Sequence, residues 1–263
     1  MQPAIPAATL ILLRDRPAAP PEIPMVGRGA HLAFAANRMV FPGGRVEDDD
    51  RLLAERADLL VDGPTLDAEE LAHRVTAIRE TIEEIGLAPE IEGLQSIAQL
   101  TEVRIALHAG EPFSLILERF WLRLNPHGVH PFARWCPQHV LQRRFDTRFY
   151  IARAPKLGEA IADGSESTHI VWNTAREHLA SGGMIFPTVR NMERVQLADS
   201  FAQAVELADR YPLDVITPWF EDHDGERWMH IPANLGYPVD RQRLSEIMGD
   251  KAPSSPSTGR EPG

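Results

Sequence analysis

Three glutamates within five residues form the part of this sequence whose types and spacing best suit chemistry. Residues 79–87 read Arg-Glu-Thr-Ile-Glu-Glu-Ile-Gly-Leu. On a helix, where each residue advances by about 100°, Glu80 and Glu84 lie one turn apart and Glu83 lies beside them. Like charges at this spacing destabilise a helix by about 0.2–0.5 kcal/mol per pair. Grouped carboxylates can instead hold a hard divalent cation, whose preferred ligands are oxygen atoms.

A solvated acidic face is the alternative explanation for these glutamates. Arg79, four residues before Glu83, offers one compensating charge, but no lysine or arginine stands four residues after any of the three. Upstream, residues 41–47 read Phe-Pro-Gly-Gly-Arg-Val-Glu. Paired glycines permit a close backbone approach that side chains would prevent, although Pro-Gly-Gly alone is more often a plain turn. The glycine pair and the acidic helix together favour a cation site.

This combination resembles the motif of the Nudix hydrolases. That motif runs glycine, five residues, glutamate, seven residues, and then Arg-Glu-hydrophobic-x-Glu-Glu-x-Gly-hydrophobic. Gly44 matches its start, and Thr81 stands where the family has a hydrophobic residue. The second half of the motif is matched by Arg79, Glu80, Glu83, Glu84, Gly86 and Leu87.

The motif carries an insertion of about twenty residues, placed at about 50–70, because Gly44 and Arg79 lie 35 positions apart. The middle glutamate of the motif therefore has more than one candidate. Asp50 has the right offset counted from Gly44, whereas Glu69 or Glu70 lies nearer to the offset counted back from Arg79.

A long insertion and an Arg-Glu-Thr-x-Glu-Glu ending also resemble the acyl-coenzyme A diphosphatase branch of the family. Further similar stretches are Arg134-Trp135 with Pro137, residues 143–149, and the helical C-terminal part, so the resemblance covers most of residues 7–240. It implies a metal-dependent hydrolase that cleaves the diphosphate bond of a nucleoside diphosphate derivative by attack of water on phosphorus. Coenzyme A or acyl-coenzyme A is the leading substrate, and the products are adenosine 3′,5′-bisphosphate and a phosphopantetheine derivative.

Two other functions stay open beside this one. The first is hydrolysis of another nucleoside diphosphate, such as ADP-ribose or a dinucleotide. The second is a non-catalytic Nudix-fold module that binds or regulates, against which the intact carboxylates argue. A small-molecule substrate is expected in either hydrolytic case, and the resemblance also allows a homodimer.

The resemblance assigns roles to individual residues. Glu80, Glu83 and Glu84 would bind Mg²⁺ or Mn²⁺, which bridges carboxylate and phosphate oxygens. Glu83 and Glu84 are therefore expected to be catalytic, and Arg79 is expected to pair with an acidic residue of the motif and orient it. Glu166 is a candidate general base by its position, with a solvated loop glutamate as the alternative.

Substrate binding has two further sets of candidates. Gly43 and Gly44 would let the backbone approach the phosphates, or would hold their loop against the helix. Arg144 and Arg148 lie on the polar face of an expected strand and could bind substrate phosphates. Surface salt bridges are the commoner fate of such residues, and Asp146 stands between the two.

Hydrophobic patterning predicts the elements that position these residues. A helix over 70–85 has an apolar side opposite the glutamates, and Gly86 stands where such a helix commonly ends. Two more helices are expected at 93–108 and 113–121. Capping signatures at Thr174/Glu177 and Ser200/Gln203 begin another two, of which the second reaches about Arg210. The apolar side of the first helix is formed by Val75, Ile78, Ile82 and Ile85.

Strands are expected at 7–13, 25–28, 39–41 and 170–172, and the alternation over 144–152 predicts a half-buried strand. Residues 17–24 are rich in proline and read as a connection. Together with the resemblance, these elements predict an α/β (α+β) fold: a Nudix-type α/β/α sandwich with a mixed sheet, helical insertions and a C-terminal helical extension. One domain would span 1–250, followed by a disordered tail at 251–263.

Composition limits the remaining possibilities. The chain has 263 residues, of which 43% are hydrophobic and 25% charged, as in ordinary globular proteins. A net charge of −11 argues against a nucleic-acid partner, and no apolar run is long enough to span a membrane. The single cysteine, Cys136, favours a reducing compartment, so a cytoplasmic enzyme is expected. Residues 222–225, Asp-His-Asp-Gly, are expected to form a hairpin turn rather than a calcium loop.

Overall fold

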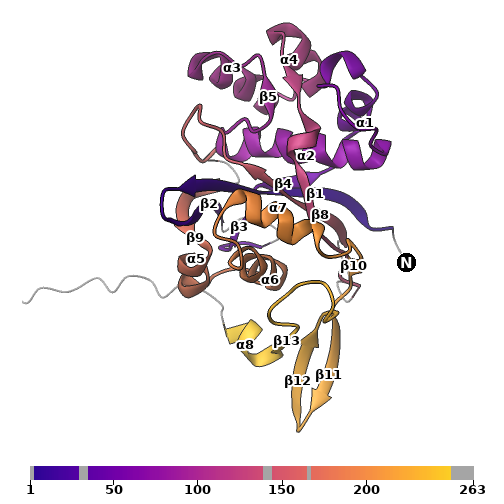
Figure 1. Ribbon diagram of the computed structural model, residues 1–263, viewed down its shortest axis with the longest axis vertical. Helices are drawn as coiled ribbons and strands as arrows, with labels where there is room; N and C mark the ends of the chain where they lie inside the picture. The colour runs from indigo at the N-terminus through magenta and orange to yellow at the C-terminus, as the bar shows by residue number, and fades with distance from the viewer. Residues whose placement is uncertain (1–2, 30–34, 139–143, 165–166, 250–263) are drawn as a thin grey trace, which may run out of the picture.

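The computed structural model describes residues 3–29, 35–138, 144–164 and 167–249, and it shows a sheet between two layers of helices (Figure 1). The predicted α/β/α sandwich is confirmed. In these ranges the main sheet has eight strands, with β4 paired to β1, β9 paired to β2, and the other six in the order β10-β7-β8-β1-β2-β3. The strands are β1 (Ile5–Arg16), β2 (Ala19–Arg28), β3 (Met39–Val40), β4 (Gly43–Arg45), β7 (His130–Trp135), β8 (Phe145–Arg153), β9 (Ser167–Thr174) and β10 (Val215–Ile216).

The sheet is mixed because β1 runs parallel to β8 and antiparallel to β2 and β4. Helices α1 to α4 lie on one side of it, and α5 to α7 lie on the other (Figure 1). The helices are α1 (Asp48–Ala54), α2 (Ala68–Ile85), α3 (Ile97–His108), α4 (Phe113–Phe120), α5 (Ala175–Ser181), α6 (Phe186–Val195), α7 (Phe201–Asp209) and α8 (Leu244–Gly249). Short 3₁₀ turns occur at η1 (Ala57–Leu59) and η2 (Pro126–Gly128).

Strand β1 divides the hydrophobic core in two because successive side chains point to opposite faces of a sheet. Leu10 and Leu12 pack in the cluster formed with α2, α3 and α4. Ile11 and Leu13 pack in the cluster formed with α6 and α7. All four side chains are fully buried. The sheet therefore separates the α2 side of the molecule from the side that carries the C-terminal segment.

Strand β8 corrects the expectation of a half-buried strand. Its side chains do alternate, but Tyr150 and Ala152 enter the α2 cluster while Phe149 and Ile151 enter the opposite one. Because β8 lies between β1 and β7 and is covered by helices on both faces, the second half of the strand is buried all round.

Helix α2 follows the prediction closely. The Asp67 side chain accepts hydrogen bonds from the backbone of Glu69 and Glu70 at its beginning. Gly86 ends it with a φ of 68°, a left-handed conformation that suits glycine. The apolar side packs at zero exposure, and each such side chain contributes roughly 1.5–3 kcal/mol when fully buried. The predicted helices at α3, α4, α5 and α7 are also confirmed.

Two segments differ from expectation, and a third forms a helix that the hydrophobic pattern does not predict. The proline-rich segment 17–24 is mostly strand, since β2 follows β1 after a tight turn at Pro17 and Ala18. Gly43 and Gly44 lie in β4 and pair with β1 rather than forming a turn. The charged run after Glu47 begins helix α1, where acidic residues near the helix N-terminus are favourable and no apolar periodicity is needed.

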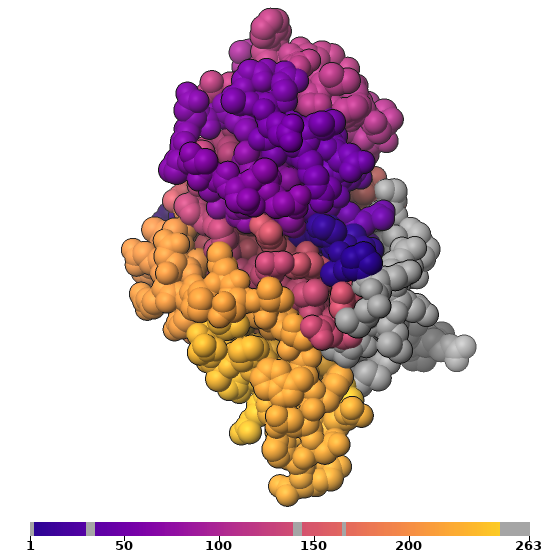
Figure 2. All heavy atoms as spheres, turned by 90° about the vertical axis from the view of Figure 1, so that its right-hand side faces the viewer, coloured from indigo at the N-terminus to yellow at the C-terminus, as the bar shows by residue number. Residues whose placement is uncertain are grey.

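The C-terminal segment adds a small antiparallel sheet of β11 (Trp219–His223), β12 (Glu226–His230) and β13 (Arg241–Arg243). Its β11–β12 hairpin projects from the lower end of the molecule (Figures 1 and 2). A two-stranded pair, β5 (Ile91–Glu92) with β6 (Arg123–Leu124), lies near α3. No helix in the described ranges is long and apolar enough to cross a membrane. Glu166 and the predicted tail at 251–263 lie outside the described residues.

Candidate active site

The candidate site lies where the C-terminal half of α2 meets strand β4. The backbone N–H of Gly43 donates to Oε2 of Glu84 over 3.2 Å. A Cβ atom on Gly44 would lie 2.2 Å from Oε1 of Glu80. One on Gly43 would lie 2.4 Å from the carbonyl oxygen of Ala8 in β1. Position 43 therefore needs glycine because the backbone of β1 leaves no room for a Cβ atom, and Gly44 leaves room for the Glu80 carboxylate against β4.

A buried ion pair anchors α1 against α2. Arg79 grips Asp50 with two parallel hydrogen bonds of 2.9 Å, from Nε to Oδ1 and from Nη2 to Oδ2. Asp50 has no exposed surface, and it also accepts from Thr76 Oγ1 at 2.8 Å and from the Glu47 backbone at 2.9 Å. Because the remaining lone pairs are used, this buried carboxylate is fully satisfied.

This pairing distinguishes the three acidic candidates for the middle motif position. Asp50, at the motif offset from Gly44, is the one that contacts Arg79. Glu69 pairs with Arg51, and Glu70 is engaged elsewhere by two arginines. The expected pairing of Arg79 with an acidic residue is therefore present, and the insertion lies after Asp50.

The same guanidinium reaches the glutamates. Nη1 of Arg79 lies 3.0 Å from Oε1 of Glu80 and 3.2 Å from Oε1 of Glu83, and Nη2 donates to the Arg45 carbonyl at 3.0 Å. Burial lowers the pKa of Arg79, but the hydrogen bond to Asp50 and the nearby carboxylates raise that pKa above its ordinary value. Arg79 is thus a fixed cation that ties α1, α2 and β4 together at the site.

The glutamates carry more negative charge than their neighbours compensate, because Arg79 is shared with Asp50 and Arg28 lies 3.7 Å from Glu84. Burial, assisted by the Glu83 and Asp50 carboxylates and opposed by Arg79, raises the pKa of Glu80 to about 7. Burial also raises the pKa of Glu83, and the Glu47 carboxylate adds to the effect. A hard divalent cation among these oxygens would offset that charge, so the donor set fits Mg²⁺ or Mn²⁺.

The oxygens of the three glutamates do not all come within 4.8 Å of one another. Glu80 and Glu83 turn to Arg79, while Glu84 accepts from Gly43 and has Oε1 3.7 Å from Nη1 of Arg28. Binding a cation therefore requires a change of side-chain rotamer away from the two arginines. Arg28, at the end of β2, is a site residue that the sequence pattern does not reveal.

Helix α3 holds the last turn of α2. Arg104 donates from Nε to the Glu83 carbonyl at 3.0 Å and from Nη2 to the Glu84 carbonyl at 3.1 Å. Nε2 of His108 lies 2.9 Å from the same Glu83 carbonyl. These side chains satisfy the carbonyls that a helix C-terminus leaves without partners. Arg104 and His108 are four residues apart, so the sequence indicates that they share one side of the expected helix. The spacing does not indicate that both contact the Glu83 carbonyl.

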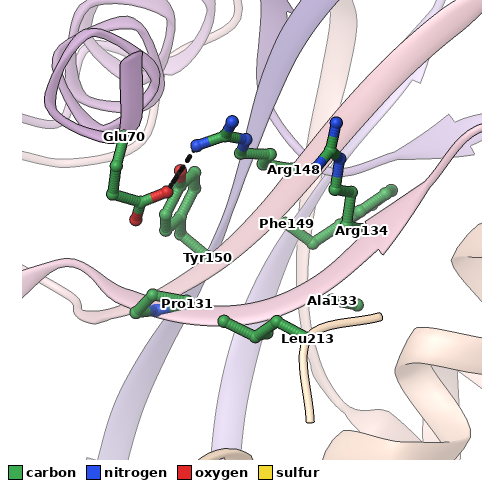
Figure 3. Close-up of a pocket in the computed structure, with 8 residues that line it drawn as sticks. All are labelled: Glu70, Pro131, Ala133, Arg134, Arg148, Phe149, Tyr150 and Leu213. Atoms are coloured by element: carbon green, nitrogen blue, oxygen red, sulfur yellow. Dashed lines mark hydrogen bonds and ion pairs between the residues drawn. The ribbon is translucent and has the colours of Figure 1, made fainter. Parts of the chain in front are cut away.

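Arg148 lies away from the glutamates. Its Nη1 binds Oε2 of Glu70 at 2.6 Å, and the Tyr150 hydroxyl donates to the same oxygen at 3.1 Å (Figure 3). Glu70 precedes Glu80 by ten residues, which is about 15 Å along a helix. This pair borders a hollow of about 170 Å³. The salt bridge weighed as an alternative for Arg148 is what the structure shows.

The remaining residues predicted from the sequence are Arg144 and Glu166. Arg144 lies just before β8, where its carbonyl accepts from the Ile5 backbone at 2.8 Å, several residues from the strand positions level with β4. Glu166 lies outside the described residues. The structure therefore brings together Gly43, Gly44, Arg79, Glu80, Glu83 and Glu84, whereas Arg148 pairs with Glu70.

Solved structures provide the comparison with known proteins. A NUDIX hydrolase from Alicyclobacillus acidocaldarius is 27% identical, with a TM-score of 0.64 over 78% of this chain and 97% of that one. The MutT protein from Methanosarcina mazei Go1 is 11% identical, with a TM-score of 0.41 over 74% of this chain and 95% of that one. The MutT NUDIX hydrolase from Burkholderia pseudomallei is 13% identical, with a TM-score of 0.41 over 73% and 98%. No family model and no curated protein sequence matches the chain.

Proposed function

Since the chain is a hydrolase of the Nudix superfamily, we propose that it cleaves the diphosphate bond of a nucleoside diphosphate derivative with the help of a divalent cation. The observation that carries this proposal is the mostly buried carboxylate of Glu80, which desolvation and the nearby Glu83 carboxylate give a pKa of about 7. A folded protein that keeps several carboxylates at such a position gains when a cation binds there.

The cation, Mg²⁺ or Mn²⁺, would be held by Glu80, Glu83 and Glu84. When bound, such an ion draws phosphate oxygens toward the carboxylates and lowers the pKa of a bound water. Arg79 keeps Glu80 and Glu83 in place through its grip on Asp50. Gly44 leaves the space in which the Glu80 carboxylate lies, and Gly43 lets β4 pack closely against β1.

Arg28 is the proposed phosphate contact of the site. Its guanidinium lies 3.7 Å from the Glu84 carboxylate and is mostly buried. A guanidinium suits phosphate because its donors match two oxygens at once. Arg148 is instead paired with Glu70, and the role considered for Arg144 stays a prediction. Glu166 stays a prediction for the general base.

Coenzyme A or acyl-coenzyme A is the proposed substrate. The support is the sequence resemblance: Phe-Pro-Gly-Gly, an insertion after Asp50, and threonine at position 81. The inserted segment, which follows Asp50, includes the rest of α1 and η1, and both of these elements pack against α4. ADP-ribose or a dinucleotide is the alternative within the same chemistry.

A substrate panel tests the proposal. Coenzyme A, an acyl-coenzyme A, ADP-ribose and a diadenosine polyphosphate are incubated with the enzyme and Mg²⁺ or Mn²⁺, and the products are separated by chromatography. Metal-dependent release of adenosine 3′,5′-bisphosphate from coenzyme A is the expected result. Fast turnover of ADP-ribose without turnover of either coenzyme would reject the substrate, and no turnover of any of them would reject the reaction.

A further inference from the structure

Three side chains with metal-binding atoms meet on the β11–β12 hairpin. The ligand atoms of Glu221, His223 and His230 all lie within 4.8 Å of one another, and no other group of three does so in the described part of the chain. The hairpin lies at the lower end of the molecule (Figures 1 and 2). Met229 of β12 packs in the core cluster on the face of the sheet opposite to α2. The cluster is therefore separate from the glutamates of α2.

The hairpin register explains why these residues meet. Glu221 and His223 are two residues apart on β11, so both point to the same face of the sheet. Trp219 pairs with His230 across the two strands, which places His230 on that face as well. The turn that joins the strands was expected from Asp222-His223-Asp224-Gly225, and the pairing of His223 with Glu226 confirms it.

Both imidazoles turn the same ring nitrogen to one carboxylate oxygen. Nε2 of His223 lies 3.1 Å from Oε2 of Glu221, and Nε2 of His230 lies 3.8 Å from it. The His230 nitrogen is buried and makes no hydrogen bond to any residue in the described ranges. A buried imidazole nitrogen without a hydrogen bond is unusual, because buried polar atoms normally find partners.

Trp219 lies on the same face of the hairpin and contacts two of the three side chains. Its indole Nε1 donates to Oε1 of Glu221 over 2.8 Å, which leaves Oε2 to face the histidines. Its ring stacks on His230, with centroids 5.6 Å apart and planes at 21°. Hydrogen bonds of this kind orient the carboxylate and imidazole ligands of metal sites.

We propose that the hairpin binds a transition-metal ion of the zinc class through Glu221, His223 and His230. Two imidazole nitrogens with one carboxylate oxygen suit Zn²⁺, with a remaining position for water. The glutamates of α2 offer oxygen atoms alone and suit harder ions such as Mg²⁺. The two sites therefore select different metals, and this proposal does not depend on the proposed hydrolysis.

Calorimetric titration of the untagged, full-length protein with ZnCl₂ tests the proposal. Excess MgCl₂ is present throughout, so that the oxygen site on α2 is filled. We expect one Zn²⁺ per chain, with affinity at least tenfold weaker in His223→Gln and in Glu221→Gln. The His223 side chain is 51% exposed, so its replacement leaves the core intact.

Matched controls keep the test specific. Glu226→Gln changes a carboxylate on the same hairpin that pairs with Arg243 at 2.9 Å and is not among the three donors. His169→Gln removes an exposed histidine from β9. Both variants should bind Zn²⁺ as the unaltered protein does. The proposal is overturned if the unaltered protein binds no Zn²⁺, or if His223→Gln binds it equally well.

Discussion

Two clusters of side chains with metal-binding atoms, the glutamates of α2 and Glu221 with two histidines on the hairpin, lie in opposite physical environments. On α2, burial raises the pKa of Glu80 to about 7, with Glu83 close by. On the hairpin, the Glu221 side chain is 47% exposed, and hydrogen bonds from Trp219 and His223 lower its pKa. The comparison teaches that the number of carboxylates does not by itself define a cation site. Burial of the carboxylates determines how much free energy cation binding releases. The types of ligand atom, oxygen or nitrogen, determine which cation binds.

Glu84→Gln should have the largest effect, because it removes one of the charges assigned to the cation. We expect hydrolysis to fall by about 100-fold or more, as when one charge-stabilising group is lost from an active site. Steady-state rates with coenzyme A and Mg²⁺ measure the effect, and circular dichroism checks folding. Glu226→Gln on the hairpin should retain its rate. A normal rate of hydrolysis in Glu84→Gln would show that this glutamate of α2 does not take part in the reaction.

Asp50→Ala should destabilise the protein strongly, because it leaves the Arg79 guanidinium buried without its main partner. Breaking a buried ion pair in this way costs about 3–5 kcal/mol in the free energy of unfolding. Glu226→Ala breaks an exposed pair with Arg243, where at most about 1 kcal/mol is expected. Urea denaturation of both variants gives the comparison. Equal losses in the free energy of unfolding would mean that the buried pair contributes no more to stability than the exposed pair.

Gly44→Ala should reduce hydrolysis by about tenfold or more, because the new methyl group displaces the Glu80 carboxylate from its position beside Arg79. Gly225→Ala on the hairpin is the contrasting variant. Its Cβ would meet no heavy atom within 4 Å, but its φ of 78° is strained for alanine. That variant should lose about 1–2 kcal/mol of stability and keep its rate. Equal rates for both variants would contradict the close approach of β4 to α2.

The last prediction concerns a pH dependence of stability in the absence of metal. The pKa of Glu80 is about 7 in the folded protein, above the ordinary value of 4.5. Its contribution to stability is thus fully present below pH 4.5 and is lost as the pH rises through 7. Melting temperatures at pH 5 and pH 8 should show this loss, and Mg²⁺ should reverse it at pH 8.

Glu80→Gln provides the control for that measurement, since glutamine does not titrate. The difference between its pH profile and that of the unaltered protein isolates Glu80 from the other titrating groups. Parallel profiles, with no added loss between pH 4.5 and pH 7 in the unaltered protein, would show that burial does not raise the pKa of the Glu80 carboxylate.

The sequence by itself determined helix α2 and the face that its glutamates share. The helical period places Glu80, Glu83 and Glu84 together and puts the apolar residues opposite, while Gly86 marks the end of the helix. These relations are local, since they depend only on spacing along one element. The Nudix resemblance was visible for the same reason, because most of its motif lies within that helix.

Only the tertiary structure decided which distant groups complete the site. Asp50 reaches Arg79 because α1 packs against α2. Arg28 reaches Glu84 from the end of strand β2. The strand pattern made Arg148 a candidate for binding substrate phosphates, but in the structure its side chain pairs with Glu70. The hairpin cluster likewise depends on the register of β11 with β12. Contacts between elements follow from packing and strand pairing, which spacing along the chain does not specify.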